Sequence, residues 1–158
     1  MSRAALEAAI PVGETIFLDT SAILAYLSGS ERVSAIAAVL IDELVGTGRN
    51  PAVASVISVC EVLVRPYRAG SPSAVRLVED FLAHFPNLRV DPITVEIAQL
   101  GARIRAATSA PTPDALILAT AVAGSAGIAV GNDAGWPGIA ERADLDLRVV
   151  VLEPLVSL

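Results

Sequence analysis

The stretch Ile16–Ser21, with the sequence IFLDTS, is the feature that most constrains the fold. Its three leading apolar residues include β-branched and aromatic side chains, which favour a short buried strand. Asp19 follows at the end of that strand, and Ser21 is a suitable N-cap for a helix over Ala22–Leu27. Because ligands of open parallel sheets bind outside the carboxyl ends of the strands, Asp19 is placed for chemistry. The alternative is that Asp19 only caps the helix.

Short apolar runs alternate with helical patterns along the rest of the chain. Further strands are expected at 51–55, 88–90, 127–130 and 148–152. Helices are expected at 31–45, 56–64, 73–84, 92–107 and 114–123, and a loop at 131–138. The Arg65-Pro66 pair is expected to end the helix at 56–64. This alternation predicts one α/β domain, with a central parallel sheet of about five strands and helices on both faces.

The domain is expected to span residues 16–154, preceded by an appendage over residues 1–15 with a helical piece at Ala4–Ile10. A hydrophobic fraction of 54% in 158 residues is enough to fill one core. No apolar run approaches the roughly 18 residues of a membrane span, and the first residues do not form a signal peptide. The single cysteine, Cys60, permits no intrachain disulfide. These features predict a cytoplasmic protein that does not associate with membranes.

The formal net charge of −6 argues against non-specific binding along a nucleic-acid backbone, which rests on a basic surface. It does not exclude a nuclease whose acids surround metal ions. All eleven basic residues are arginines, and the chain contains no lysine. This excludes a P-loop, Schiff-base chemistry, and the receiver domains and phosphatases that pair a strand-end aspartate with a lysine.

Four acids interrupt patterns of burial: Asp19, Glu61, Asp114 and Asp133. Asp114 could instead complement a helix dipole, and Asp133 could be a turn residue in the sequence NDAG. Glu61 lies inside the apolar stretch VISVCEVLV, where an unpaired carboxylate is costly to bury. Its alternative role is an ion pair with Arg65 one helical turn later.

The ends of parallel strands meet at one edge of a sheet, so Asp19 and Asp133 are expected to lie close together. Carboxylates gathered in this way need a cation between them or raised pKa values. Hard oxygen ligands select Mg²⁺ or Mn²⁺. Two such ions could activate a water and stabilise the leaving oxygen of a phosphodiester.

Four segments carry these acids: IFLDTSAIL at 16–24, SVISVCEVL at 55–63, PTPDALILATA at 111–121 and GNDAGW at 131–136. In this ordered set the chain resembles PIN-domain ribonucleases of the VapC toxin type, over about residues 16–154. The resemblance implies a metal-dependent endoribonuclease that uses Mg²⁺ or Mn²⁺. By this resemblance the catalytic metal site consists of Asp19, Glu61, Asp114 and Asp133. Ser21 and Asn132 are implied to orient these ligands. It also implies an RNA substrate, a VapB-like antitoxin partner and a homodimer.

The chain departs from this pattern at Gly131, where relatives often have Ser or Thr before the Asn-Asp pair, and in its longer N-terminal segment. Arg65 and Arg68 flank the Glu61 helix and are the candidates for phosphate binding; the alternative is a solvated surface.

Other conspicuous residues receive structural roles. Cys60 is expected in the core, His84 at a helix C-terminus, and Trp136 packed over the site loop. Two rival functions remain at this point. One is a PIN-like module that only binds RNA or protein, and the other is a housekeeping PIN nuclease without an antitoxin.

Overall fold

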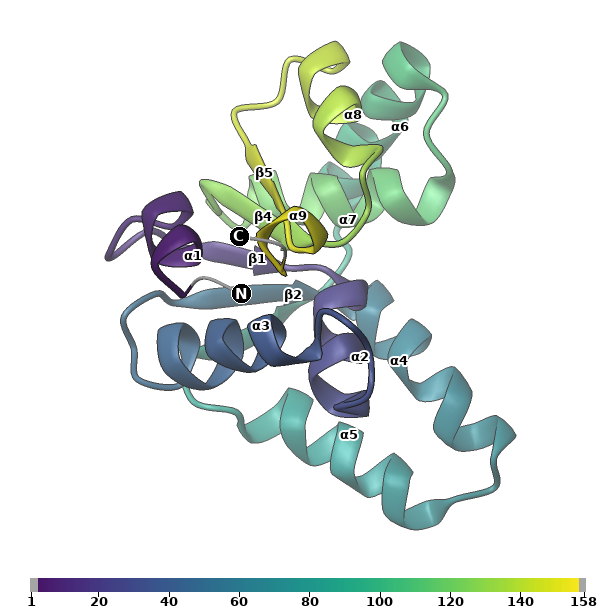
Figure 1. The fold of residues 1–158 in the computed structure, drawn as a ribbon. Coiled ribbons are helices and arrows are strands. Elements are labelled where there is room, and N and C mark those ends of the chain that lie inside the picture. Colours follow the sequence, from purple (N-terminus) through teal and green to yellow (C-terminus); the bar gives the residue numbers. More distant parts are fainter. Residues whose placement is uncertain (1–2, 157–158) are drawn as a thin grey trace.

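Five parallel strands form the centre of the fold, in the order β3-β2-β1-β4-β5 (Figure 1). The computed structural model describes residues 3–156. The strands are β1 (Ile16–Leu18), β2 (Ala52–Ser55), β3 (Leu88–Asp91), β4 (Ile128–Gly131) and β5 (Arg148–Val151). In the middle strand, Ile16 of β1 is in register with Ala52 of β2 and with Ile128 of β4. All three β1 side chains are fully buried, as the apolar IFL run predicts.

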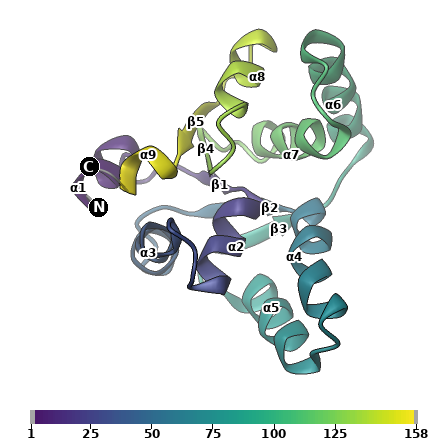
Figure 2. The ribbon, with the colours of Figure 1, turned by 45° about the vertical axis from the view of Figure 1, so that its right-hand side comes forward.

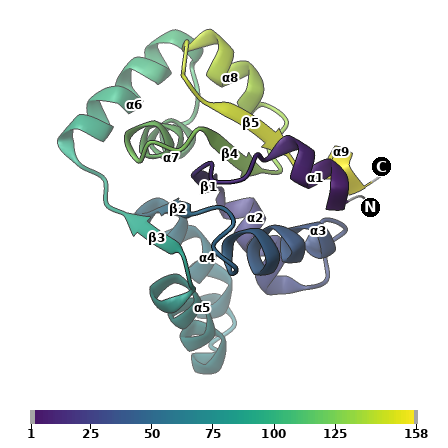
Figure 3. The same cartoon turned by 90° about the vertical axis from the view of Figure 1, so that its left-hand side faces the viewer.

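Helices cover both faces of this sheet, as expected from the sequence (Figures 1 and 2). One group comprises α2 (Thr20–Ser28), α3 (Ser34–Ala38), α4 (Val56–Arg68) and α5 (Pro72–His84). The other comprises α6 (Val95–Thr108), α7 (Thr112–Ala123) and α8 (Trp136–Arg142). Figure 3 shows the sheet between the two groups. Short helices α1 (Arg3–Ala9) and α9 (Glu153–Val156) lie beside the sheet.

Two hydrophobic cores result, one on each face. Side chains alternate along a strand, so Ile16 and Leu18 belong to the core beneath α2, α3 and α5, while Phe17 belongs to the core beneath α6 and α7. Leu6 and Ile10, in and just after α1, are fully buried in the first core. The chain segment before β1 therefore packs onto the domain.

Several helix boundaries differ from the prediction. α4 continues through Pro66 to Arg68 instead of ending at the Arg65-Pro66 pair. The expected helix at 31–45 starts at Ser34 and continues as a π-helical stretch, η1 (Val39–Val45). α8 and α9 were not expected, and α8 begins at Trp136, within the last three residues of the segment expected to be a loop, and continues to Arg142. These differences arise where packing outweighs local preference.

Two residues also have surroundings that differ from the prediction. Asp19, not Ser21, is the N-cap of α2, which begins at Thr20. Cys60 is exposed because it lies on the outer face of α4. His84 ends α5, as expected. No helix within residues 3–156 is long and apolar enough to cross a membrane.

Candidate active site

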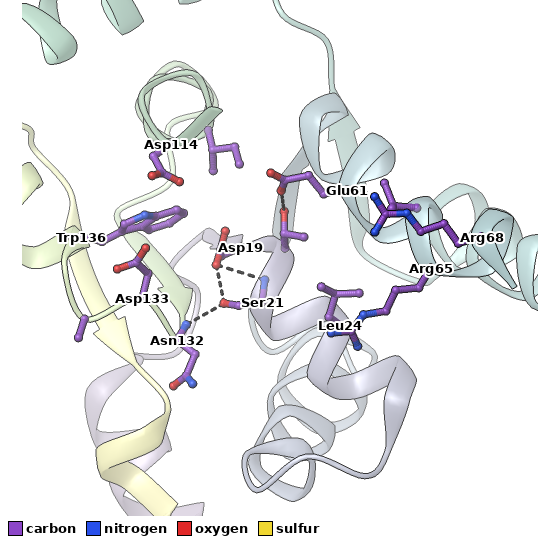
Figure 4. Close-up of a pocket in the computed structure, with 14 residues that line it drawn as sticks. Asp19, Ser21, Leu24, Glu61, Arg65, Arg68, Asp114, Asn132, Asp133 and Trp136 are labelled. Atoms are coloured by element: carbon purple, nitrogen blue, oxygen red, sulfur yellow. Dashed lines mark hydrogen bonds between the residues drawn. The ribbon is translucent and has the colours of Figure 1, made fainter. Parts of the chain in front are cut away.

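The four predicted acids line a single pocket beyond the carboxyl ends of β1 and β4 (Figure 4). Asp19 follows β1, and Asp133 follows β4. Glu61 projects from α4, and Asp114 lies in the first turn of α7. Two of these elements, α4 and α7, lie on opposite faces of the sheet (Figure 1). The pocket therefore forms where the chain connections of the parallel sheet diverge, the usual ligand position in such folds.

Asp19 is 5% exposed and both caps α2 and lines the pocket. One of its carboxylate oxygens, Oδ2, accepts hydrogen bonds from the Ser21 backbone N–H at 3.2 Å and from the Ser21 hydroxyl at 2.5 Å. Burial raises the pKa of Asp19, the nearby Glu61 charge adds to that rise, and the bonds from Ser21 counteract it. The capping role and the site role proposed from the sequence are therefore compatible.

Ser21 connects Asp19 to the segment that carries Asp133. Its hydroxyl accepts a hydrogen bond from the backbone N–H of Asn132 at 2.8 Å. The Asn132 side chain turns to the start of α9, where its Oδ1 accepts from the Glu153 backbone N–H at 2.9 Å. Asn132 thus contributes its backbone to the Ser21 contact, while its side chain anchors α9.

Glu61 does not pair with Arg65. Its carboxylate accepts a hydrogen bond from the hydroxyl of Thr20, which is 7% exposed and lies 3.0 Å from the Ser58 hydroxyl. Thr20 and Ser58 were not among the site residues predicted from the sequence. The available signals were a hydroxyl residue directly after the strand-end acid, and a serine one helical turn before Glu61.

Asp114 is partly buried, and the indole of Trp136 lies between it and Asp133 (Figure 4). Burial raises the pKa of Asp114, and the charges of Asp133 and Glu61 raise it further. The Trp136 indole N–H makes no full hydrogen bond to a described residue, but it lies close enough to Asp114 to lower that pKa in part. Trp136 is 2% exposed and belongs to the core beneath α6 and α7, so it packs rather than presenting a stacking face.

Asp133 is exposed, and its carboxylate accepts a 2.7 Å hydrogen bond from the Gly135 backbone N–H. This contact is the turn role considered for Asp133, and the residue still lines the pocket. The turn fixes where the carboxylate enters the site.

Gly131 has a steric reason to lack a side chain. A Cβ atom there would lie 2.7 Å from the Asp19 Cβ and 2.8 Å from Asp19 Oδ2. Asp19 occupies the space that a Ser or Thr would need. The absence of a side chain at position 131 is therefore what allows Asp19 to sit against this backbone.

The donor set fits a hard divalent cation, because it consists of carboxylate oxygens from four segments. The raised pKa values of Asp19 and Asp114 indicate carboxylates that lack a compensating positive charge. Within residues 3–156, no three acidic, histidine or cysteine side chains are close enough to enclose a metal ion as they stand. A cation would therefore have to draw these side chains together.

The sheet and the pocket define a parallel α/β domain that gathers carboxylates at the switch point of its strands. The PIN domain family model matches residues 16–141. The chain therefore belongs to the PIN domain family, as the sequence motifs predicted.

Solved structures with the same fold include toxins and toxin–antitoxin complexes. The VapC20 toxin of Mycobacterium tuberculosis, which cleaves the sarcin-ricin loop, is 17% identical with a TM-score of 0.64, covering 78% of this chain and 94% of that one. VapBC2 of Rickettsia felis, bound to promoter DNA, is 14% identical with a TM-score of 0.66, and the match covers 88% of this chain and 99% of that one. FitAcB of Neisseria gonorrhoeae is 24% identical with a TM-score of 0.60, and the match covers 85% of this chain and 96% of that one. At these identities the likeness shows the fold. No curated protein matches the sequence.

Proposed function

We propose that this chain is a metal-dependent endoribonuclease and the toxin of a toxin–antitoxin pair. The observation that carries the proposal is the convergence of Asp19, Glu61, Asp114 and Asp133 on one pocket from four separate segments. Membership of the PIN family supports it, as does the similarity in fold to a VapC toxin that cleaves the sarcin-ricin loop.

These four carboxylates would hold Mg²⁺ or Mn²⁺. The bound ion supplies an activated water and charge neutralisation at the leaving oxygen of the phosphodiester. The chain's own contribution is orientation. Ser21 fixes the Asp19 carboxylate, and Thr20 fixes that of Glu61. The buried Trp136 indole lies between Asp114 and Asp133 and limits where their carboxylates can move.

Cleavage of a defined single-stranded RNA, with chelator and then with added Mg²⁺ or Mn²⁺, tests the proposal. We expect cleavage only with metal. Asp114→Asn should lose at least about 10- to 100-fold in activity, the range known for loss of groups that merely support metal ligands. Asp146→Asn is the matched control, since Asp146 is exposed and does not line the pocket.

Undetectable cleavage by the parent chain would reject the nuclease, and cleavage without metal would reject the metal dependence. Near-normal cleavage by Asp114→Asn would remove Asp114 from the site. Mapping new RNA 5′ ends after induction in cells, with Asp19→Asn as the inactive comparison, would then identify the target. A circular dichroism melt of each variant establishes that it is folded.

We further propose a cognate VapB-like antitoxin that inserts a cation into the acid pocket, and a homodimer of the toxin. Solved structures with this fold include a toxin–antitoxin complex from Klebsiella pneumoniae. A guanidinium suits clustered carboxylates through paired, charge-assisted hydrogen bonds. A complex that leaves the four acids uncovered would contradict this blocking mode. The absence of any co-encoded partner would favour a housekeeping PIN nuclease, and light scattering would measure the oligomeric state.

A further inference from the structure

One face of α4 carries charged side chains from the acid pocket toward the end of the helix. Glu61, Arg65 and Arg68 follow one another at spacings of four and three residues, which places them on the same helical face. All three line the pocket, and in Figure 4 both arginine side chains extend from α4 on the side of Glu61 away from Asp114. The pocket thus has an acidic centre and a cationic edge formed by the α4 arginine pair, Arg65 and Arg68.

This arginine pair is only weakly engaged within the protein. Arg65 lies 3.9 Å from Glu31, in an ion pair whose side chains are 72% and 41% exposed. Such a distant, solvated pair contributes little. Arg68 makes no ion pair or hydrogen bond to any residue within 3–156. Six other arginines have nearer partners: Arg3, Arg32, Arg49, Arg89, Arg105 and Arg148.

The extension of α4 beyond Pro66 is what brings Arg68 to the pocket. A helix ending at Arg65 would leave residue 68 in the following turn, without a fixed direction. With a rise of about 1.5 Å per residue, Arg65 and Arg68 lie about 6 and about 10 Å along the axis from Glu61. They are therefore beyond the acid cluster but within reach of a strand whose reacting phosphate lies in it.

RNA is a polyanion, and it needs local cations such as these in order to bind to this chain. The net charge of −6 gives no overall attraction for RNA, and the uncompensated pocket acids repel phosphate. Arginine is suited to phosphate because its planar guanidinium donates two parallel hydrogen bonds. An acidic protein segment would meet the same two cations but would also meet the repulsion of four pocket carboxylates, with no chemistry to compensate.

We propose that Arg65 and Arg68 bind backbone phosphates of the RNA next to the scissile phosphodiester, so that the substrate strand leaves the site along α4. The inference rests on the proposed ribonuclease function. The contacts are to the backbone and carry no base specificity. They exist in the bound substrate as well as in the transition state, so their loss raises KM and leaves kcat nearly unchanged.

The test measures the anisotropy of a fluorescein-labelled single-stranded RNA with Mg²⁺ present, in an Asp114→Asn background that prevents cleavage. Affinity is followed from about 50 to about 200 mM salt. We expect Arg65→Gln/Arg68→Gln to weaken binding at least about tenfold at the lowest salt. Each single-strand phosphate contact contributes about 0.7 to the slope of log K against log salt, so the slope should flatten by about 1.4.

Two further variants isolate the cause. Arg103→Gln/Arg142→Gln removes the same charge from exposed positions on α6 and α8 outside the pocket, and should leave the slope unchanged. Arg65→Lys/Arg68→Lys keeps both charges and should retain the slope while losing part of the affinity. In the cleaving parent background, the glutamine pair should raise KM with kcat within about twofold.

An unchanged affinity and slope in the glutamine pair would overturn the inference, and would point to a protein partner for these arginines. An equal loss in the Arg103/Arg142 control, or no RNA binding by the unsubstituted background, would overturn it as well. A parent chain that binds RNA through the pair but never cleaves it would instead reject the proposed ribonuclease while leaving the binding site in place.

Discussion

Asp19 combines a structural task with a chemical one. As the cap of α2 its carboxylate satisfies backbone and hydroxyl donors of Ser21, and as a pocket residue it is buried beside another acid. A cap alone does not need to be buried, because an exposed carboxylate accepts the same hydrogen bonds. The burial is what raises its pKa and makes the ionised form unfavourable in the folded protein.

We therefore expect Asp19→Asn to stabilise the metal-free protein. Asparagine also caps helices well, so the fold should be kept. A raised folded-state pKa means that the parent loses stability as pH rises from the ordinary aspartate pKa through the folded one, and the variant escapes this loss. The gain should be near zero in acid and reach a few degrees in Tm near neutral pH, at about 2–4 °C per kcal/mol.

Added Mn²⁺ should narrow or reverse this order. Ligand at about 100 times its Kd stabilises the native state by about 2.7 kcal/mol, and only the parent has the full set of ligands. Thermal melts of both proteins across pH, with chelator and with metal, measure the effect. A metal-free variant that melts below the parent near neutral pH would count against a burial penalty at Asp19.

Gly131 provides a steric test of the same carboxylate. In Gly131→Ala the new Cβ would meet Asp19 within 3 Å, and Asp19 is too buried to move freely. We expect a loss of about 1–3 kcal/mol, typical of overpacking, together with weaker metal binding. Gly138→Ala is the control, because there the nearest atom is the flexible end of Arg142. Urea denaturation and metal titration measure both effects; equal losses in the two variants would contradict the steric reading.

At the scale of elements, α2 and α4 meet at the pocket through the Thr20 hydroxyl. Thr20→Val keeps the shape but leaves the buried Ser58 hydroxyl and the Glu61 carboxylate without this contact. We expect a loss of about 1–3 kcal/mol, as for an unsatisfied buried polar group. Thr47→Val, on an exposed hydroxyl bound to the Glu43 carbonyl, should change stability by less than about 0.5 kcal/mol. Chemical denaturation compares them, and matching values would show that the contact is unimportant.

The elements that the sequence predicted well are those with a strong local signal. β1 has three consecutive apolar residues, and α7 is almost wholly apolar after its first turn, which matches its burial. α8 was missed because Gly135 and Pro137 near its start favour a loop, while burial of Trp136 and Ile139 in the core supplies the stabilisation. The continuation of α4 through Pro66 likewise depends on packing against α5, which no local pattern contains.

At the scale of the whole molecule, the pocket acids could be predicted because each one breaks a pattern of burial. Their surroundings could not. Thr20 reaches Glu61 across 41 residues of sequence, and Asn132 reaches Ser21 across 111. Such contacts depend on strand order, which hydrophobic periodicity does not specify. The reason for a glycine at position 131 could not be predicted either, because it depends on the space taken by a side chain that follows another strand.

The pocket draws its carboxylates from both sides of the sheet, Glu61 from α4 and Asp114 from α7. An ion held by both would add a link between the two cores, beyond the strands they share and the direct contacts between α4 and α7. Local opening of either core would then disrupt the metal site, so the opening of the two cores should become coupled. We expect Mn²⁺ to slow amide hydrogen exchange in α4 and α7 alike, and Asp114→Asn to limit any slowing to α4. Catalysis would then require both cores, and so the entire domain, to be folded at the same time.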